Sequence, residues 1–376
     1  MANLRFLEGI NMSEWKEYKL KDITYKITSG GTPKSAEASY YDGDIPWLNT
    51  KEINFNRIGK TERYITEDGL NNSSAKWIPK DSVIIAMYGT TAAKVAYSLI
   101  DLTTNQACCN LIINKDIADS KFVYYYIQSS YEDLFNLACG AAQQNLSVGV
   151  IAEFPILLPP LEEQKRIASI LSSLDDKIDL LHRENTTLEA MAETLFRQWF
   201  IEEAKEDWEE VLLDFIAFLN AGGDKPKRVS QSCTEDCNVP IYSNGIENEG
   251  LYGYTDIPKI VDESVTISAR GTIGYVVLRT EPFVPIVRLI TLIPKECVTS
   301  KYLYYLLKNQ NIEGTGTTQQ QLTVPDFKQM KVLLPEKVLI DRFTNEVNVY
   351  YDKILENKKN IGVIIQMRDK LLKYLY

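Results

Sequence analysis

The chain of 376 residues is 45% hydrophobic and 24% charged, which is typical of a soluble globular protein with about two domains. Its net charge of −10 excludes a protein that coats nucleic acid by bulk electrostatic attraction. The charge still permits DNA binding through a local surface, or through a complex whose basic surface lies on another subunit.

Metal and membrane signals are weak. Six cysteines are present, but none has the paired spacing of a zinc site, and His182 is the single histidine. We therefore expect no bound metal and reduced thiols. No run of eighteen apolar residues occurs, and the N-terminus lacks the pattern of a signal peptide. The sequence predicts a cytoplasmic protein without a membrane span.

The first half of the chain alternates polar loops with short apolar segments. It opens with WKEYKLKDI and continues into a glycine-, proline- and serine-rich loop over residues 29–44. Two β-branched segments, 82–89 and 107–114, predict strands. Residues 121–138 have the apolar spacing of an amphipathic helix with an aromatic face. The Gln-rich loop GAAQQNLS then leads to an apolar run that ends at a proline.

The same order of segments returns in the second half. WEEVLLDFI precedes a polar loop over 220–238, predicted strands at 264–271 and 286–294, a predicted helix at 301–310, and the Gln-rich GTGTTQQQLT. Trp208 lies 193 residues after Trp15, whereas Pro335 lies 176 residues after Pro159, so the loops differ in length. The repeat therefore predicts two similar globular domains of mixed α/β (α+β) class.

Each copy ends in a long stretch with the apolar period of a coiled coil, the first from residue 161 to 200 and the second after Pro335. Spacings of four and three alternate in both stretches, and only Arg368 interrupts the second. The predicted seam consists of Ile167, Leu171, Leu174, Ile178, Leu181, Asn185 and Leu188, with Phe343, Val347, Tyr350, Ile354, Asn357 and Ile361.

A helix of forty residues is about 60 Å long and cannot bury a single apolar stripe alone. We therefore predict that the two stretches pair as an antiparallel coiled coil within the chain. One asparagine in each seam would fix the register at a cost in stability. Two similar heads would then be related by a pseudo-twofold axis and held at a fixed separation.

Catalytic signatures are missing from the sequence. GTTAAK at residues 89–94 lacks the second glycine and the hydroxyl residue of a phosphate loop, and no GxGxxG follows a predicted strand. A single histidine on a long helix completes no Ser-His-Asp or Cys-His arrangement. The chain is therefore predicted to be non-catalytic.

Two similar heads at fixed spacing suit duplex DNA, whose half-sites recur about 34 Å apart per helical turn. Base edges are read by amide, hydroxyl, Lys and Arg side chains on exposed loops. The candidates in the first half are Ser29, Thr32, Lys34, Lys51, Tyr88, Thr90, Lys94, Gln143, Gln144 and Asn145. The candidates in the second half are Lys225, Lys227, Arg228, Arg270, Thr272, Gln319, Gln320 and Gln321. Tyr88 and Thr90 correspond roughly to Arg270 and Thr272.

These motifs resemble the specificity subunit of type I restriction-modification systems. The resemblance rests on GGTPKS, YYDGDIPWLNTKEI, ARGTIGYV with its looser partner MYGTTAAKV, QQNLS, QQQLT, and above all ILLPPLEEQKRIASILSSLDDKI. It spans nearly the whole chain. It implies target recognition domains at 1–158 and 204–334, and conserved spacer helices at 159–203 and 335–376.

The resemblance also implies partners and cofactors. The helices would set the spacer of a split DNA site and bind two methyltransferase subunits, with restriction and translocase subunits as further partners. S-adenosylmethionine, ATP and Mg²⁺ would belong to those partners, and this chain would bind none. LLPEKVLIDRF departs from the PPLEEQ form of the first helix start, and the second half lacks a close counterpart of IPWLNTKEI, having VPIYSNGIENEG instead.

Two other functions remain open at the level of sequence. A scaffold would use its coiled coil and both heads to bind other proteins, without any dependence on DNA. A self-contained nuclease or methyltransferase would act on DNA as the purified chain, which we do not expect.

Overall fold

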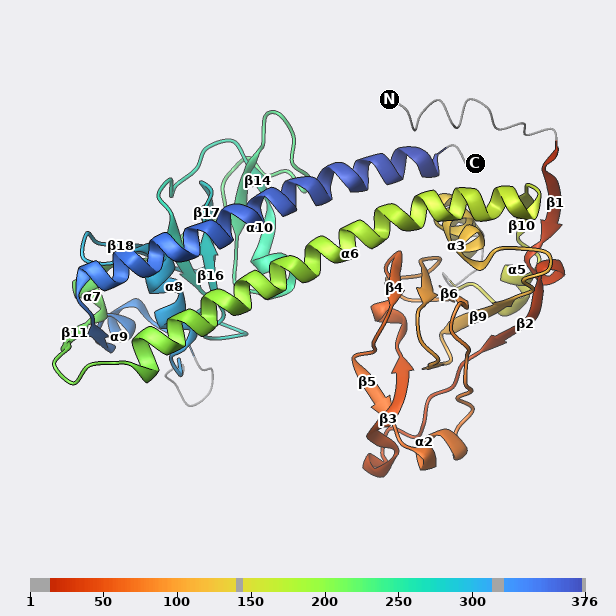
Figure 1. The fold of residues 1–376 in the computed structure, drawn as a ribbon, viewed down its shortest axis with the longest axis horizontal. Helices are drawn as coiled ribbons and strands as arrows, with labels where there is room; N and C mark the ends of the chain where they lie inside the picture. The colour runs from red at the N-terminus through yellow and green to blue at the C-terminus, as the bar shows by residue number, and fades with distance from the viewer. Residues whose placement is uncertain (1–13, 140–144, 313–320, 374–376) are drawn as a thin grey trace. The chain divides into compact units, whose positions relative to one another are not determined.

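The computed structural model describes residues 14–139, 145–312 and 321–373. The chain divides into two compact units, one formed by Met1–Leu181 with Lys359–Tyr376 and the other by His182–Lys358. Each unit contains one globular head and one end of each long helix (Figure 1). We call residues 14–158 the first head and residues 208–334 the second head.

The first head is built on three sheets. The main sheet has the order β2-β9-β6-β7-β4, with β2 (Thr24–Ser29), β9 (Cys108–Ile113), β6 (Val83–Ala86), β7 (Val95–Ser98) and β4 (Asn56–Ile58). The second sheet has the order β5-β3-β8, with β5 (Arg63–Ile65), β3 (Tyr41–Leu48) and β8 (Thr103–Thr104). A ribbon pairs β1 (Lys16–Lys19) with β10 (Pro155–Leu158).

The second head repeats this plan with one strand fewer. Its main sheet has the order β12-β18-β15-β16, with β12 (Ala217–Ala221), β18 (Ile290–Pro294), β15 (Ser264–Ile267) and β16 (Val276–Arg279). Its second sheet has the order β14-β13-β17, with β14 (Leu251–Thr255), β13 (Val239–Tyr242) and β17 (Val284–Pro285). A ribbon pairs β11 (Glu209–Leu212) with β19 (Lys331–Leu334). Among the described residues, no strand pairs with β16 in the way that β4 pairs with β7.

Short helices complete each head, and side-chain caps begin several of them. The first head contains α2 (Glu67–Asn71), α3 (Ser120–Ser129), α4 (Tyr131–Cys139) and α5 (Val148–Ala152), and the second contains α7 (Leu213–Ile216), α8 (Ser300–Lys308) and α9 (Val324–Lys328). Asp119 accepts the Phe122 N–H at the start of α3, and Thr299 accepts the Tyr302 N–H at the start of α8. The equivalent helices are therefore capped in the same way.

The long helices are α6 (Leu161–Arg197) and α10 (Lys337–Leu372). A π-helical turn over Gln198–Glu202 follows α6. Within each unit the two helices contact one another, and residue numbers rise along one helix as they fall along the other. In the first unit Asp175 meets Arg368 while Ile178 and Leu181 pack against Ile361. In the second unit Asn185 meets Asn357 while Phe196 packs against Phe343. The helix ends therefore pack antiparallel in both units.

Each head forms its own core against the helices. In the first unit the core includes α3 and β9 together with Ile167 and Leu171 of α6 and Leu372 of α10. In the second unit Phe196 of α6 and Phe343 of α10 join α8 and β15. The apolar stripe of each long helix is thus buried partly by the other helix and partly by a head.

Two expectations change in the structure. The stretch 121–138 forms two helices, because the hydroxyls of Ser129 and Ser130 donate to Tyr126 O and compete with the helical backbone. The strand expected at 286–294 begins only at Ile290, because Val287 and Arg288 adopt positive φ values of 52° and 62° and form a turn.

The VPIYSNGIENEG segment stands in the second head where IPWLNTKEI stands in the first. β13 carries Val239–Tyr242, and it pairs antiparallel with β14 and parallel with β17. β3 pairs in the same manner with β5 and β8. The VPIY segment therefore occupies the place of IPWL, because its strand pairing is the same although most residues differ.

Candidate nucleic-acid interface

In each head one turn of the main sheet contacts the end of the Gln-rich segment. This turn follows β6 in the first head and β15 in the second. Leu146 N–H donates to Met87 O at 2.8 Å, and Tyr88 forms an antiparallel bridge with Asn145. In the second head Leu322 N–H donates to Ala269 O at 3.0 Å. Tyr88 and Asn145 of the first head therefore correspond to Arg270 and Gln321 of the second.

The turn of the first head is held by its neighbours. Gly89 and Ala93 adopt positive φ values of 86° and 65°, and the Thr91 hydroxyl donates to Thr50 O at 2.9 Å. Lys94 donates to Asn54 Oδ1 at 2.7 Å, so its ammonium faces the loop after β3. Thr90 at the tip is exposed. This turn presents a hydroxyl and an aromatic side chain on a fixed backbone.

The glycine loops support the heads. A Cβ at Gly30 would overlap Thr104, and a Cβ at Gly222 would approach Ile286 N to 2.8 Å, so both positions require glycine. Ser29 is half-buried in β2, while the Thr32 hydroxyl contacts Gln106 Oε1. Lys34 is exposed beyond them.

The remaining basic candidates differ in how far carboxylates neutralise them. Lys51 pairs with Glu62 at 2.8 Å, and Arg228 pairs with Asp236 at 3.1 Å and with Asp256 at 3.5 Å. Lys225 instead lies over the Tyr252 ring, 5.8 Å from its centre. Lys227 and Thr272 are exposed. Gln143, Gln144, Gln319 and Gln320 lie outside the described residues.

The predicted seam residues all lie on α6 and α10, where each is buried or half-buried. In the first unit Ile178 and Leu181 pack against Ile361. In the second unit Asn357 Nδ2 donates to Asn185 Oδ1 at 2.9 Å and to Glu184 Oε2 at 3.1 Å. The two asparagines therefore face one another across the helix pair.

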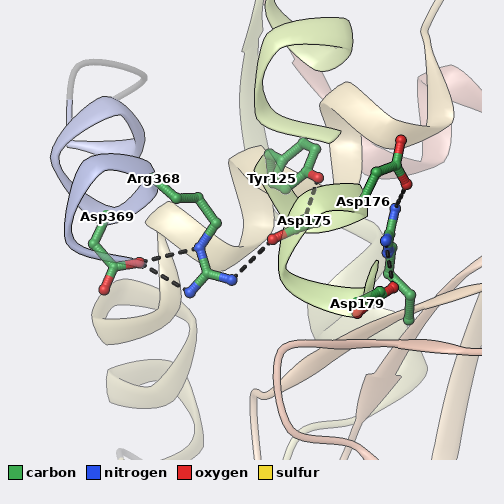
Figure 2. Close-up of polar contacts among 7 residues, drawn as sticks. Tyr125, Asp175, Asp176, Asp179, Arg368 and Asp369 are labelled. Carbon is green, nitrogen blue, oxygen red and sulfur yellow. Dashed lines mark hydrogen bonds and ion pairs between the residues drawn. The ribbon is translucent and has the colours of Figure 1, made fainter. Parts of the chain in front are cut away.

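Arg368, which interrupts the predicted heptad pattern, takes part in a buried ionic network (Figure 2). Its Nη1 donates to Asp175 Oδ1 at 3.0 Å, and the Tyr125 hydroxyl donates to Asp175 Oδ2 at 2.6 Å. Asp175 is 9% exposed and Arg368 is 16% exposed. Burial and the Asp175 carboxylate together raise the pKa of Tyr125 above its usual value. This network joins α3, α6 and α10.

A second ionic contact fixes the first head on α6. Arg57 of β4 donates through Nη1 to Asp176 Oδ1 at 2.6 Å and through Nη2 to Asp179 Oδ2 (Figure 2). The guanidinium is only 10% exposed, whereas both carboxylates reach solvent. Burial lowers the pKa of Arg57, but the two carboxylates outweigh burial and raise it. Sequence reasoning missed this contact, since nothing in the strand β4 indicates its partner.

The described residues offer little for metal or membrane chemistry. No group of three or more His, Cys, Asp or Glu side chains in the described ranges is arranged to hold a metal ion. His182 is exposed on α6. In the same part of the chain, no helix has the length and apolarity needed to cross a membrane.

Comparison with known proteins gives a consistent result. A family model described as the type I restriction modification DNA specificity domain matches residues 12–190 and 205–360. The specificity subunit of the type I restriction enzyme MjaIX from Methanocaldococcus jannaschii is 27% identical over 404 residues, covering 96% of this chain and 92% of that relative. The EcoR124I/EcoR124II specificity subunit of Escherichia coli is 32% identical over 178 residues, covering 46% of this chain and 43% of that relative.

A solved structure shares the fold. The crystal structure of a type I restriction-modification system S subunit from M. genitalium has a TM-score of 0.58 at 18% identity, covering 98% of this chain and 96% of that one.

Proposed function

Because the chain belongs to the family of type I restriction-modification DNA specificity subunits, we propose that it reads a bipartite, asymmetric DNA site with one half-site per head. The observation that carries the proposal is the repeated junction of turn and Gln-rich segment. The same backbone contact presents Tyr88 and Asn145 in the first head but Arg270 and Gln321 in the second. Different side chains at equivalent places predict different half-sites.

The helices would give the complex its geometry. We propose that α6 and α10 form one antiparallel coiled coil, that a pseudo-twofold axis relates the heads, and that the helix pair sets the spacer between half-sites. The target recognition domains would span 1–158 and 204–334, and the spacer helices 159–203 and 335–376. Two methyltransferase subunits would dock on the helices.

The catalytic steps would then belong to the partner subunits. Specificity subunits as a family are non-catalytic. We place S-adenosylmethionine on the methyltransferase subunits, and ATP and Mg²⁺ on restriction and translocase subunits, in a cytoplasmic complex that acts on double-stranded DNA. The acidic net charge of −10 fits a subunit whose partners supply much of the phosphate-binding surface.

The test is the pattern of methylated adenines in cells that carry the complete system. Deletion of this chain should abolish methylation at one split motif. The double change Gln143→Ala with Gln144→Ala should alter the first half of that motif and leave the second half intact. Methylation that persists without the chain would contradict the proposal. A chain that assembles partners without any effect on DNA selectivity would instead be a scaffold.

A further inference from the structure

Residues 269–275 of the second head form a turn whose base is fixed on both sides. Ala269 N–H donates to Asn244 Oδ1 at 2.7 Å, and Ala269 O accepts the Leu322 N–H at 3.0 Å. Gly271 and Gly274 adopt positive φ values of 70° and 83°, which suits a tight turn between β15 and β16. The residue after Ala269 therefore projects from an anchored backbone.

That residue is Arg270, and a second side chain holds its guanidinium. Nε and Nη2 of Arg270 both donate to Gln321 Oε1, at 3.0 Å and 2.7 Å. Arg270 is nevertheless exposed, and no carboxylate of the described residues forms an ion pair with it. Arg228 and Arg279 of the same unit both pair with carboxylates. Arg270 thus keeps its positive charge available while its side chain is oriented.

The bond to Gln321 occupies one edge of the planar fork and leaves the other edge free. Nη1 carries two N–H donors and Nη2 retains one beyond its bond to Gln321. Guanine presents two neighbouring acceptors, O6 and N7, in the major groove, and a bidentate arginine is the commonest contact to them. Because the side chain is already ordered, less rotamer entropy is lost when the base is bound.

We propose that Arg270, oriented by Gln321, reads a guanine in the half-site bound by the second head. This inference rests on the proposed function and adds to it the base that one residue selects. The first head places Tyr88 and Asn145 at the equivalent positions, so its half-site lacks this contact. Gln321 acts as a positioning residue, because it contacts Arg270 and orders its free edge.

The experiment maps methylated motifs in cells that carry the complete complex and lack other methyltransferases. The wild-type complex should methylate one split motif. Arg270→Ala should reduce the preference for guanine at a single position of one half-site by about 10- to 100-fold and leave the other half-site unchanged. Arg270→Gln should shift that position toward adenine, since glutamine pairs with adenine N6 and N7. Gln321→Ala should weaken the preference by several-fold with the same motif.

A matched control removes another basic side chain of the second unit. Lys331 lies on β19 and pairs with Glu210 at 2.6 Å, and Lys331→Ala should leave the motif unchanged. An Arg270→Ala complex that keeps full base preference, or that binds every sequence more weakly by the same factor, overturns the inference. If Arg270→Ala abolishes assembly, Arg270→Gln and Gln321→Ala decide the question. A wild-type complex without any split motif would instead contradict the proposed function.

Discussion

Tyr125 of the first head and Tyr305 of the second occupy equivalent places on α3 and α8, yet their hydroxyls meet different partners. Tyr125 donates to the carboxylate of Asp175 at 2.6 Å, whereas Tyr305 and Tyr351 share a hydrogen bond of 3.1 Å. Asp175 and Tyr351 lie the same distance into α6 and α10, as judged from Pro159 and Pro335. The repeat preserves the place of the contact while its chemistry changes.

The contacts around these two tyrosines also differ, with more charged side chains in the first unit and more aromatic packing in the second. In the first unit Arg57 and Arg368 bring two further charges to α6, and the adjoining core is aliphatic at Ile167 and Leu372. In the second unit Phe343 packs against Phe196 and Phe200, with ring centres 5.7 and 5.3 Å apart. Ion pairs of two largely buried arginines hold the first head on the helices, whereas aromatic packing, with the half-exposed ion pair of Lys308 and Glu193, holds the second. The two copies of a duplicated fold can therefore keep the same architecture although different interactions hold each head on the helices.

Removing the centre of the aromatic cluster should have the largest effect. Phe343 is fully buried, so Phe343→Ala should lower the free energy of unfolding of the second unit by about 3–5 kcal/mol. Denaturant titration gives the magnitude, and hydrogen exchange should localise the lost protection to 182–358. Val338→Ala, on the same helix but 80% exposed, should change stability by less than about 0.5 kcal/mol. Equal loss of protection in both units would contradict the conclusion that Phe343 stabilises the second unit alone.

Breaking the ionic network should come next. Asp175→Ala leaves the Arg368 guanidinium without its buried partner and should cost about 2–3 kcal/mol in the first unit. The double change Asp175→Tyr with Arg368→Ala copies the second unit, where Tyr351 and Ala192 stand at the equivalent positions. This exchange should restore most of the lost stability. If the double variant is as unstable as Asp175→Ala, the two contacts are not interchangeable, and the comparison of the heads is wrong at this point.

The contact from β4 should matter less, because both of its carboxylates reach solvent. Arg57→Ala should cost about 1 kcal/mol and increase hydrogen exchange along α6 near Asp176. Asp352 of α10 corresponds to Asp176, and it is exposed. Asp352→Ala therefore serves as the control and should leave exchange unchanged. Equal responses to the two substitutions would remove the distinction between the heads.

The smallest effect concerns Glu153 at the end of α5 and the two lysines that contact it, Lys19 at the end of β1 and Lys21 in the turn that follows. Lys19 and Lys21 both donate to Glu153, at 2.6 and 2.5 Å, and they lower the pKa of that carboxyl to about 2. Because the folded-state pKa is depressed, this contribution is present above the ordinary value of 4.5 and is lost as the pH falls toward 2. NMR titration should show the Glu153 pKa rising in Lys19→Ala with Lys21→Ala. An unchanged titration would show that these lysines do not set it.

The periodic features of the fold were accessible from sequence because they depend on neighbours along the chain. Alternating spacings of three and four identified side chains that lie buried or half-buried on α6 and α10. The repeat also indicated that Tyr88 and Arg270 are equivalent, and the backbone bonds from Leu146 and Leu322 agree. Local patterns of this kind survive sequence divergence.

Contacts between distant segments were not accessible in this way. Arg368 stands where the heptad pattern predicts an apolar side chain. Its partner, Asp175, lies on the other helix, one residue after the predicted seam position Leu174, so neither stretch alone indicates the pair. Recognising the pair requires the register between two helices. The partner of Arg57 is harder still to infer, since Arg57 reaches α6 from a three-residue strand that has no counterpart in the described part of the second head. The sequence set VPIYSNGIENEG against IPWLNTKEI, but the shared strand pairing of β13 and β3 was not accessible because their side chains differ.

The hydrogen bond between Asn185 and Asn357 limits how the lengths of the two long helices can change during evolution. Removing seven residues from α6 alone would move Asn185 away from Asn357 and leave the two amides without this hydrogen bond. Only deletions of equal length in both helices would bring the two amides together again. On the proposal that the helix pair sets the spacer between half-sites, changes in the length recognised along DNA should arise through paired insertions or deletions, and an unpaired one should be lost through misfolding.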